Sequence, residues 1–133
     1  MPDWHEFKLR VRFEETDALQ VVYYSKYLVW FEVGRINLFR EVGLPYLEMA
    51  SRGMHTPVVQ AHADYLSFAR FDDEILVRTR VASIGKSSIR FESEVYKLPE
   101  MKLVCTGHTV HTLINGDGRP VRVPDDFRSK LLS

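Results

Sequence analysis

The chain has 133 residues, of which 45% are hydrophobic and 27% are charged, a composition typical of an ordinary globular protein that buries a core. Its 18 basic residues equal its 18 acidic residues, so the net charge gives no reason to expect nucleic acid as a partner. The single cysteine excludes a disulfide within the chain and is typical of a protein in a reducing compartment.

The length favours a single domain that covers residues 1–133. No apolar run approaches the roughly 20 residues that span a bilayer. The first residues also lack the basic segment and the apolar run of a signal peptide. We therefore expect a cytoplasmic protein without a membrane span.

Residues 5–13 alternate loosely between apolar and basic side chains. The apolar members are Phe7, Leu9, Val11 and Phe13. A period of two predicts a half-buried strand over this segment, with the apolar side chains on one face. Residues 14–20 break the pattern and are expected to form a loop.

The next segment has the periodicity of a long helix. Ser25 is a candidate N-cap, because its hydroxyl can accept an unpaired backbone N–H, and Gly43 stands where such a helix often ends. The apolar residues between them form one broad stripe: Tyr27, Leu28, Phe31, Leu38, Phe39 and Val42, with a second row of Val29, Val33 and Ile36. A surface helix usually has a narrower stripe, so we expect this one to be mostly enclosed. A short helical turn over residues 45–52, ended at Gly53, is expected to follow.

Beyond Met54 the helical period disappears. We expect strands over residues 56–68, 75–84, 88–98 and 103–114, joined at hairpin lengths. Residues 115–118 contain Asn-Gly and Asp-Gly, which both favour a tight turn. A short strand over residues 121–123 and a helix over residues 124–132 are expected at the end. This order predicts an α+β fold in which a curved antiparallel sheet of five to six strands wraps one long helix.

Asp17 lies in the loop just before the expected helix N-terminus. Such a terminus presents unpaired backbone N–H groups and the positive end of the helix dipole, which can polarise a carbonyl or hold an oxyanion. A carboxylate close by could attack that carbonyl or activate water toward it. The combination is suited to acyl transfer, whereas an aspartate in a polar loop more often serves as a turn residue.

The segment from Arg12 to Glu32 resembles the N-terminal signature of the hotdog-fold acyl-CoA thioesterases, the group of 4-hydroxybenzoyl-CoA thioesterase and the Tol-Pal-associated thioesterases. The matching features are the aromatic Phe13, the pair Thr16-Asp17, the run Val21-Val22-Tyr23 and the run from Tyr27-Leu28 to Phe31-Glu32. Residues 65–75, 81–91 and 118–124 resemble later segments of the family in the same order. The resemblance therefore covers nearly the whole chain.

The resemblance implies the hotdog fold and hydrolysis of an acyl-CoA thioester to a free acid and coenzyme A. Asp17 matches the family's catalytic carboxylate, which would act as nucleophile or general base. The backbone N–H of Tyr24 would polarise the thioester carbonyl. Gln20 stands where the family often has glycine, so its side chain is expected to narrow or reshape the acyl pocket.

The resemblance also implies contacts to the phosphates of coenzyme A from basic loops near a dimer seam. Our candidates are Lys86 and Arg119, together with Ser87 and Ser88 of the same hairpin. Coenzyme A is part of the substrate, so no separate cofactor is expected. One helix against one sheet leaves an edge and an apolar helix flank uncovered, and the family pairs two chains into one sheet. We therefore expect a dimer or, by pairing of dimers, a tetramer.

Other polar residues are weaker candidates. His108 and His111 are three residues apart on an expected strand, so their side chains face opposite sides and cannot easily share a metal. His62 and Asp64 share a face and are expected to form a surface pair. Cys105 is expected to be a core thiol. We expect no metal site.

Two other functions remain open. A non-catalytic acyl-CoA-binding protein of the same fold would normally carry a DNA-binding extension, for which this chain has no spare residues. A hotdog hydratase or dehydratase needs a histidine placed against an acidic residue, and the opening loop has no histidine. The sequence does not specify whether the acyl group is aromatic or aliphatic, or how long it is.

Overall fold

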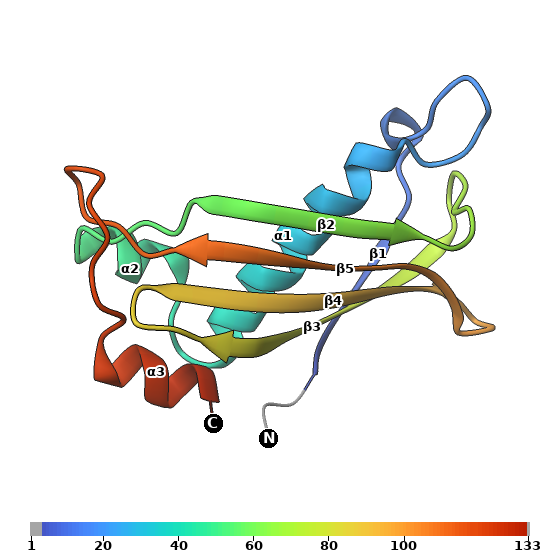
Figure 1. The fold of residues 1–133 in the computed structure, drawn as a ribbon. Helices are drawn as coiled ribbons and strands as arrows, with labels where there is room; N and C mark the ends of the chain where they lie inside the picture. Colours follow the sequence, from blue (N-terminus) through green and yellow to red (C-terminus); the bar gives the residue numbers. More distant parts are fainter. Residues whose placement is uncertain (1–3, 133) are drawn as a thin grey trace.

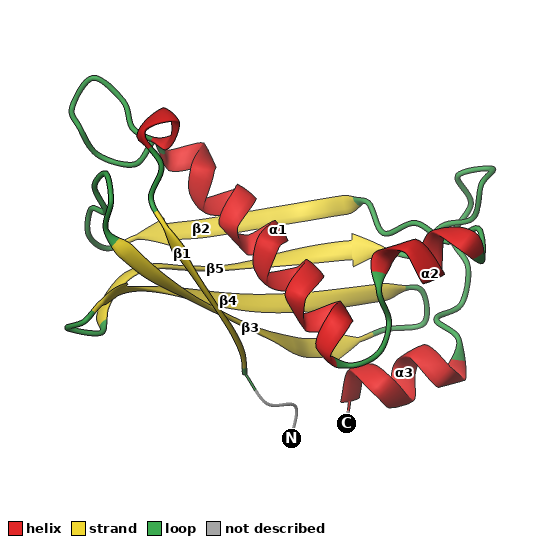
Figure 2. Ribbon diagram, turned by 180° about the vertical axis from the view of Figure 1, so that it is seen from behind, coloured by secondary structure: helices red, strands yellow, loops and turns green. Residues whose placement is uncertain are grey.

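The structure, a computed structural model, describes residues 4–132. Within these residues five strands form one antiparallel sheet in the order β1-β3-β4-β5-β2, and the long helix α1 lies across one of its faces (Figures 1 and 2). The strands are β1 (His5–Arg10), β2 (Val58–Tyr65), β3 (Glu74–Ile84), β4 (Ser88–Leu98) and β5 (Lys102–Thr112). The helices are α1 (Tyr24–Glu41), α2 (Tyr46–Ser51) and α3 (Asp125–Leu132), and a 3-10 turn, η1, covers Phe13–Glu15. The expected α+β arrangement is confirmed.

α1 begins at Tyr24, so the expectation that Ser25 caps it is wrong. Ser25 lies in the first turn, and the preceding residue Tyr23 gives no side-chain cap. Backbone contacts fix the helix start instead: the Tyr23 N–H donates to the Glu15 carbonyl at 2.9 Å, and the Tyr23 carbonyl accepts the Lys26 N–H at 2.9 Å. The other end is as expected, because Gly43 follows the last turn with a φ of 83°.

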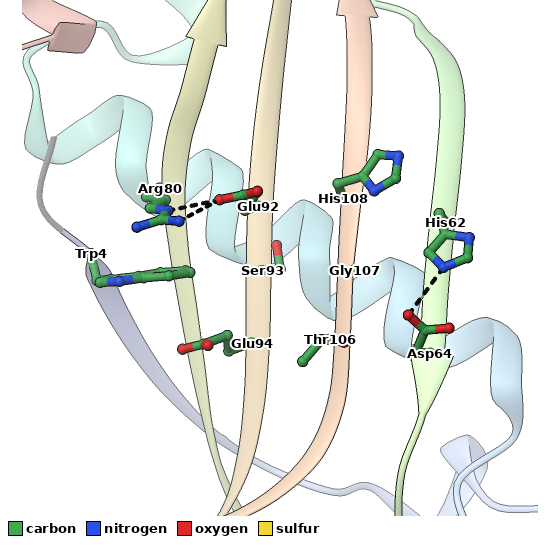
Figure 3. A pocket seen from close by; sticks show the side chains of 10 residues that line it. All are labelled: Trp4, His62, Asp64, Arg80, Glu92, Ser93, Glu94, Thr106, Gly107 and His108. Carbon is green, nitrogen blue, oxygen red and sulfur yellow. Dashed lines mark hydrogen bonds and ion pairs between the residues drawn. The ribbon is translucent and has the colours of Figure 1, made fainter.

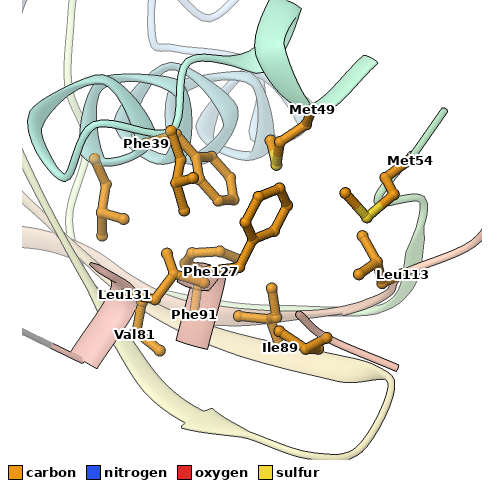
Figure 4. Packing of buried hydrophobic residues seen from close by; sticks show 12 residues of the cluster. Phe39, Met49, Met54, Val81, Ile89, Phe91, Leu113, Phe127 and Leu131 are labelled. Carbon is orange, nitrogen blue, oxygen red and sulfur yellow. The ribbon is translucent and has the colours of Figure 1, made fainter. Parts of the chain in front are cut away.

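Two buried clusters flank the middle of α1. The first lies toward the helix N-terminus and contains Val11, Val22, Tyr27, Trp30, Phe31, Ala69, Ile75, Val77, Val95, Val104 and Cys105. The second lies where α1, α2, α3 and the sheet meet, and contains Leu38, Phe39, Leu44, Met49, Met54, Val81, Ile89, Phe91, Leu113, Val123, Phe127 and Leu131 (Figure 4). Cys105 is the expected core thiol: it is fully buried, and this burial, with a smaller contribution from Asp64, raises its pKa to about 12.

The chain does not cover all of its apolar surface. Every residue of β2 except Ala63 is exposed, and β2 pairs with β5 alone within the described residues. The second apolar row of α1 is only partly covered, with Val29 43% exposed. The helix is therefore less enclosed than its apolar stripe predicts, and a sheet edge and a helix flank remain open to solvent.

Three expected strands differ clearly from the structure. β2 spans Val58–Tyr65 rather than residues 56–68. β1 ends at Arg10 rather than Phe13, because the Val11 N–H donates to the Asp73 carbonyl at 3.0 Å and the chain then turns away into η1. Phe13 is consequently 77% exposed and not part of the core. Residues 121–123 form no strand, since their pairing is limited to single contacts such as that of the Val123 N–H with the Lys86 carbonyl.

A buried carboxylate ties the loop after η1 to the long helix. Glu15 is 3% exposed, and its Oε2 accepts the indole N–H of Trp30 at 2.9 Å. Its Oε1 accepts the backbone N–H of Arg12 at 2.8 Å, and the Arg12 guanidinium lies 3.6 Å from Oε2. Buried charges persist only when paired and hydrogen-bonded, and this one meets that condition. Asp17 stands two residues beyond this anchor.

Replacing Glu15 with alanine should lower the free energy of unfolding by about 2–3 kcal/mol, because the buried indole N–H of Trp30 loses its acceptor. Glu14→Ala is the matched control, since Glu14 pairs with Arg12 in solvent and such a pair contributes at most about 1 kcal/mol. Urea denaturation followed by fluorescence measures both. Equal midpoints for the two variants would show that Glu15 does not anchor the loop.

Candidate functional site

The loop that carries Asp17 is closed by backbone hydrogen bonds and fixed to the sheet. The Asp17 N–H donates to the Val21 carbonyl at 3.0 Å, and the Gln20 N–H donates back to the Asp17 carbonyl at 2.9 Å. The Val22 N–H donates to the Ala69 carbonyl at 2.8 Å, which ties the loop to the connection between β2 and β3. The position of Asp17 is therefore set by contacts within its own loop and by a segment that is distant in the sequence.

The carboxylate of Asp17 is held by one oxygen. Its Oδ1 accepts the Leu19 N–H at 2.8 Å, which is the ordinary turn contact of an aspartate. The side chain is partly exposed, and Oδ2 has no hydrogen-bond or ion-pair partner within residues 4–132. A carboxylate that is oriented through one oxygen and open at the other can act as a nucleophile or a base.

The loop of Asp17 leads into the N-terminus of α1, which is open. Within residues 4–132 neither the Tyr24 nor the Ser25 N–H has an acceptor, whereas the Lys26 N–H is already bonded to the Tyr23 carbonyl. A hydrogen bond and charge repulsion from Tyr24 raise the pKa of Tyr23, and the negative charge of Asp17 contributes in the same direction. The Tyr23 N–H donates to the Glu15 carbonyl at 2.9 Å, so the loop of Asp17 is closed at the start of α1.

An open pocket of about 730 Å³ adjoins Asp17. It is lined by Phe13, Glu14, Thr16, Asp17, Ala18, Gln20, Arg70 and Phe71. The rings of Phe13 and Phe71 meet edge to face, with centroids 5.9 Å apart, and form an apolar wall. Its size and apolar wall are typical of a small-molecule site. Phe13 is not predicted as a pocket residue from the sequence, because the alternating pattern assigns it to a strand.

Gln20 has a φ of 66°, a left-handed conformation that favours glycine. A glycine would adopt this conformation without strain, in line with the expectation from the resemblance. A residue with a side chain costs on the order of 1 kcal/mol here. The side chain of Gln20 lines the pocket beside Asp17, which is the place where it is expected to reshape the acyl site.

The candidate coenzyme A residues lie far from Asp17 in the same chain. Lys86 and Ser87 lie in the turn between β3 and β4, Ser88 is the first residue of β4, and Arg119 lies in the loop after β5. Figure 1 shows these loops at the end of the sheet opposite the loop before α1. The 11 residues of β3 span roughly 35 Å at about 3.3 Å per residue. One chain therefore places Asp17 in the loop that leads into Tyr24, but does not bring the four candidate phosphate contacts to that loop.

A second cavity, of about 400 Å³, lies between the middle of α1 and the start of β2. It is lined by Glu32, Arg35, Ile36, Phe39, Tyr46, Thr56, Pro57, Val58 and His111. Both ring nitrogens of His111 are satisfied, Nδ1 by the Thr56 carbonyl at 2.8 Å and Nε2 by the Thr109 hydroxyl at 2.9 Å. Burial lowers the pKa of His111 to about 4, so it is neutral at pH 7 and serves as a structural histidine.

The sheet face opposite α1 carries a polar hollow of about 290 Å³ (Figure 3). Its charged groups are paired with one another: Arg80 with Glu92 at 2.7 Å, and His62 with Asp64 at 3.1 Å. Trp4 stacks against Arg80, with the guanidinium carbon 4.5 Å from the ring centroid. These charged groups satisfy one another, whereas Nε2 of His108 in the same hollow is buried without a hydrogen-bond partner within residues 4–132. Because its charges are paired, the hollow is a weaker candidate for chemistry than the loop of Asp17. The expected surface pair of His62 and Asp64 is confirmed.

The histidines do not assemble into a metal centre. His108 lies on the open face, stacked on His62 with ring centroids 5.4 Å apart, and His111 is buried on the helix face. The prediction that His108 and His111 face opposite sides is confirmed. Residues 4–132 contain no group of three or more His, Cys, Asp or Glu placed to hold a metal ion.

In the same described range, each helix is too short or too polar to cross a membrane.

Comparison with known proteins gives matches over nearly the whole chain. The sequence model of the thioesterase-like superfamily matches residues 11–131. A putative acyl-CoA thioesterase of Bacillus subtilis, YneP, is 36% identical over 121 residues, which cover 90% of this chain and 87% of that protein. The acyl-CoA thioesterase YbgC of Haemophilus influenzae is 33% identical over 124 residues, which cover 92% of this chain and 90% of that protein.

The fold agrees with these sequence matches. A crystal structure of a hypothetical protein from Thermus thermophilus superposes with a TM-score of 0.90 at 32% identity, and covers 96% of this chain and 98% of the other. The family match, the two relatives and the shared fold show that this chain belongs to the thioesterase-like superfamily of hotdog-fold proteins.

Proposed function

We propose that this protein hydrolyses acyl-CoA thioesters to carboxylic acids and coenzyme A. The observation that carries the proposal is an Asp17 carboxylate, open at Oδ2 beside an apolar pocket, in a loop that leads directly into the open N-terminus of the 18-residue helix α1. Membership of the thioesterase-like superfamily supports the reaction class. The Bacillus and Haemophilus relatives, named as acyl-CoA thioesterases, support acyl-CoA as the substrate.

The thioester carbonyl oxygen accepts the Tyr24 N–H in this mechanism. Negative charge grows on that oxygen as the tetrahedral intermediate forms, so the N–H and the helix dipole stabilise the transition state more than the bound substrate. In one route, Oδ2 of Asp17 attacks the carbonyl carbon, the C–S bond breaks, and water later hydrolyses the resulting anhydride. In the other, the carboxylate takes a proton from water and the hydroxide attacks the same carbon. The tetrahedral intermediate then breaks its C–S bond, and the departing thiolate of coenzyme A takes the proton from Asp17.

A hydratase is less well supported. That chemistry needs a histidine against an acidic group, and no histidine is among the residues that line the pocket beside Asp17. The buried His111 belongs to the other cavity, and both of its ring nitrogens are hydrogen-bonded within the protein.

We also propose that two chains pair through the exposed edge of β2. The unpaired backbone groups of this edge and the partly exposed Val29 flank are surfaces that a second copy would cover. In an antiparallel two-fold pair the β2 strands run in opposite directions, so opposite ends of the two sheets lie side by side. The partner's Lys86 and the partner's Arg119 would then approach the end of the sheet that carries Asp17. This arrangement accounts for the separation of the candidate residues in one chain.

Asp17→Asn keeps the shape of the side chain and an oxygen that accepts the Leu19 N–H, but removes the charge needed for attack or proton transfer. We expect kcat on the best acyl-CoA to fall about a hundredfold or more while KM changes little. The exposed loop aspartate Asp117, changed to asparagine, is the matched control and should keep wild-type turnover. Thermal melting verifies that both variants fold. Wild-type turnover by a folded Asp17→Asn protein would rule out Asp17 as the catalytic carboxylate.

The proposed pairing predicts a particle of two or four times 15.5 kDa in light scattering at micromolar concentration. Val59→Lys places a charge on the edge strand, where the side chain is 61% exposed, and should shift the mass toward the monomer. Met101→Lys, in the turn between β4 and β5, is the control and should leave the mass unchanged. A wild-type monomer would exclude the pairing.

Lys86→Glu tests the candidate phosphate contact. Phosphate contacts are made equally in the ground and transition states, so KM should rise more than kcat falls. Lys8→Glu, on the outer edge strand β1, is the control with the same change of charge and should keep the wild-type KM. If neither Lys86→Glu nor Arg119→Glu changes KM, the nucleotide of coenzyme A lies elsewhere.

A further inference from the structure

Tyr65, the last residue of β2, reaches from the sheet to the first turn of α1. Its hydroxyl donates to the Tyr24 carbonyl at 3.0 Å. Its ring meets the ring of Tyr27 with centroids 5.4 Å apart and that of Tyr24 at 6.4 Å. Within residues 4–132 this is the one side-chain hydrogen bond to the backbone of that turn. The contact therefore joins the sheet to the backbone that carries the open N–H groups.

The bonded carbonyl belongs to the same peptide group as the Ser25 N–H. A hydrogen bond to the carbonyl of a peptide group fixes its plane and makes its N–H a stronger donor. The neighbouring peptide group carries the Tyr24 N–H, and its carbonyl, that of Tyr23, is bonded to the Lys26 N–H. Both open donors thus belong to peptide groups whose carbonyls accept bonds within the helix, and Tyr65 adds a side-chain donor to the Tyr24 carbonyl.

The position of Tyr65 is itself well fixed. The residue pairs with Cys105 of β5, and the next N–H, that of Leu66, donates to the Val104 carbonyl at 2.8 Å. Burial, with smaller contributions from Cys105 and Tyr24, raises the pKa of the Tyr65 hydroxyl, so this group keeps its proton at neutral pH. The Tyr65 hydroxyl therefore remains a hydrogen-bond donor at the neutral pH at which an ionised carboxylate can act as nucleophile or base.

We propose that Tyr65 is a positioning residue for thioester hydrolysis: its hydroxyl holds the first turn of α1 so that the Tyr24 and Ser25 N–H groups stay directed at the thioester oxygen. The inference rests on the proposed function. Tyr65 acts through the Tyr24–Ser25 peptide group and does not touch the reacting atoms. Its role is to limit the reorientation of donors that must be in place when negative charge develops.

The test is Tyr65→Phe, which keeps the ring and removes the hydroxyl. We expect kcat to fall about three- to tenfold, the loss that corresponds to one ordinary hydrogen bond. KM should stay within about twofold, because the N–H donors bind the thioester oxygen strongly only once negative charge develops in the transition state. In a 15N spectrum, the Ser25 amide signal should shift, because its peptide group has lost the bond at the carbonyl.

Tyr96→Phe is the matched control, since it removes a hydroxyl that contacts Glu94 on β4 and should keep wild-type kcat. Melting temperatures identify any loss of kcat that is caused by unfolding of a variant. Wild-type kcat in Tyr65→Phe, or a loss no greater than the loss of folded protein, overturns the inference. If Asp17→Asn is inactive in the same assay, the proposed reaction stands, and wild-type kcat in Tyr65→Phe overturns only the role of Tyr65. If Asp17→Asn is fully active, the proposed mechanism fails first.

Discussion

The buried carboxylate of Glu15 joins two parts of the chain that the proposed chemistry needs in one place. It accepts the indole N–H of Trp30 in α1, and the backbone carbonyl of the same residue accepts the Tyr23 N–H just before that helix. Side chain and backbone of one residue thus clamp both ends of the loop that holds Asp17. Such a charge is tolerated in the interior because its oxygens are hydrogen-bonded and the Arg12 guanidinium is near. The geometry of the carboxylate and the helix terminus depends on this clamp.

Local pattern is enough to predict most of the architecture. The end of the helix near Gly43, the hairpins and the turn before Gly118 follow from glycine positions and from periodicity, which are properties of neighbouring residues. The resemblance to hotdog thioesterases points to Asp17 through its motif alone. Two of the wrong expectations, the start of the helix and the end of the first strand, have one cause. The start of α1 and the end of β1 are decided by backbone bonds to Glu15 and Asp73, and no local rule reveals such partners.

The site residues also divide into those that a local motif identifies and those that only contacts between distant residues reveal. Asp17 and Tyr24 are close in sequence, so a motif identifies them together. Tyr65 is 41 residues from Tyr24, and only the folded chain shows that its hydroxyl bonds the helix turn. Lys86 and Asp17 lie at opposite ends of the sheet in one chain. Both can therefore serve one site only if a second chain contributes its Lys86. Sequence can name such residues individually, whereas their relation is a property of the fold and of association.

The burial of Cys105 affects the way in which the proposed reaction can be followed. The thiolate is the reactive form of cysteine, and a thiol with a pKa of about 12 at a fully buried position is almost wholly protonated and shielded at neutral pH. The reaction releases a free thiol in solution. The protein's own sulfur therefore neither competes for a thiol-specific reagent nor exchanges into mixed disulfides with the product. Colour developed by such a reagent reports turnover directly, and product thiol can accumulate without modifying the catalyst.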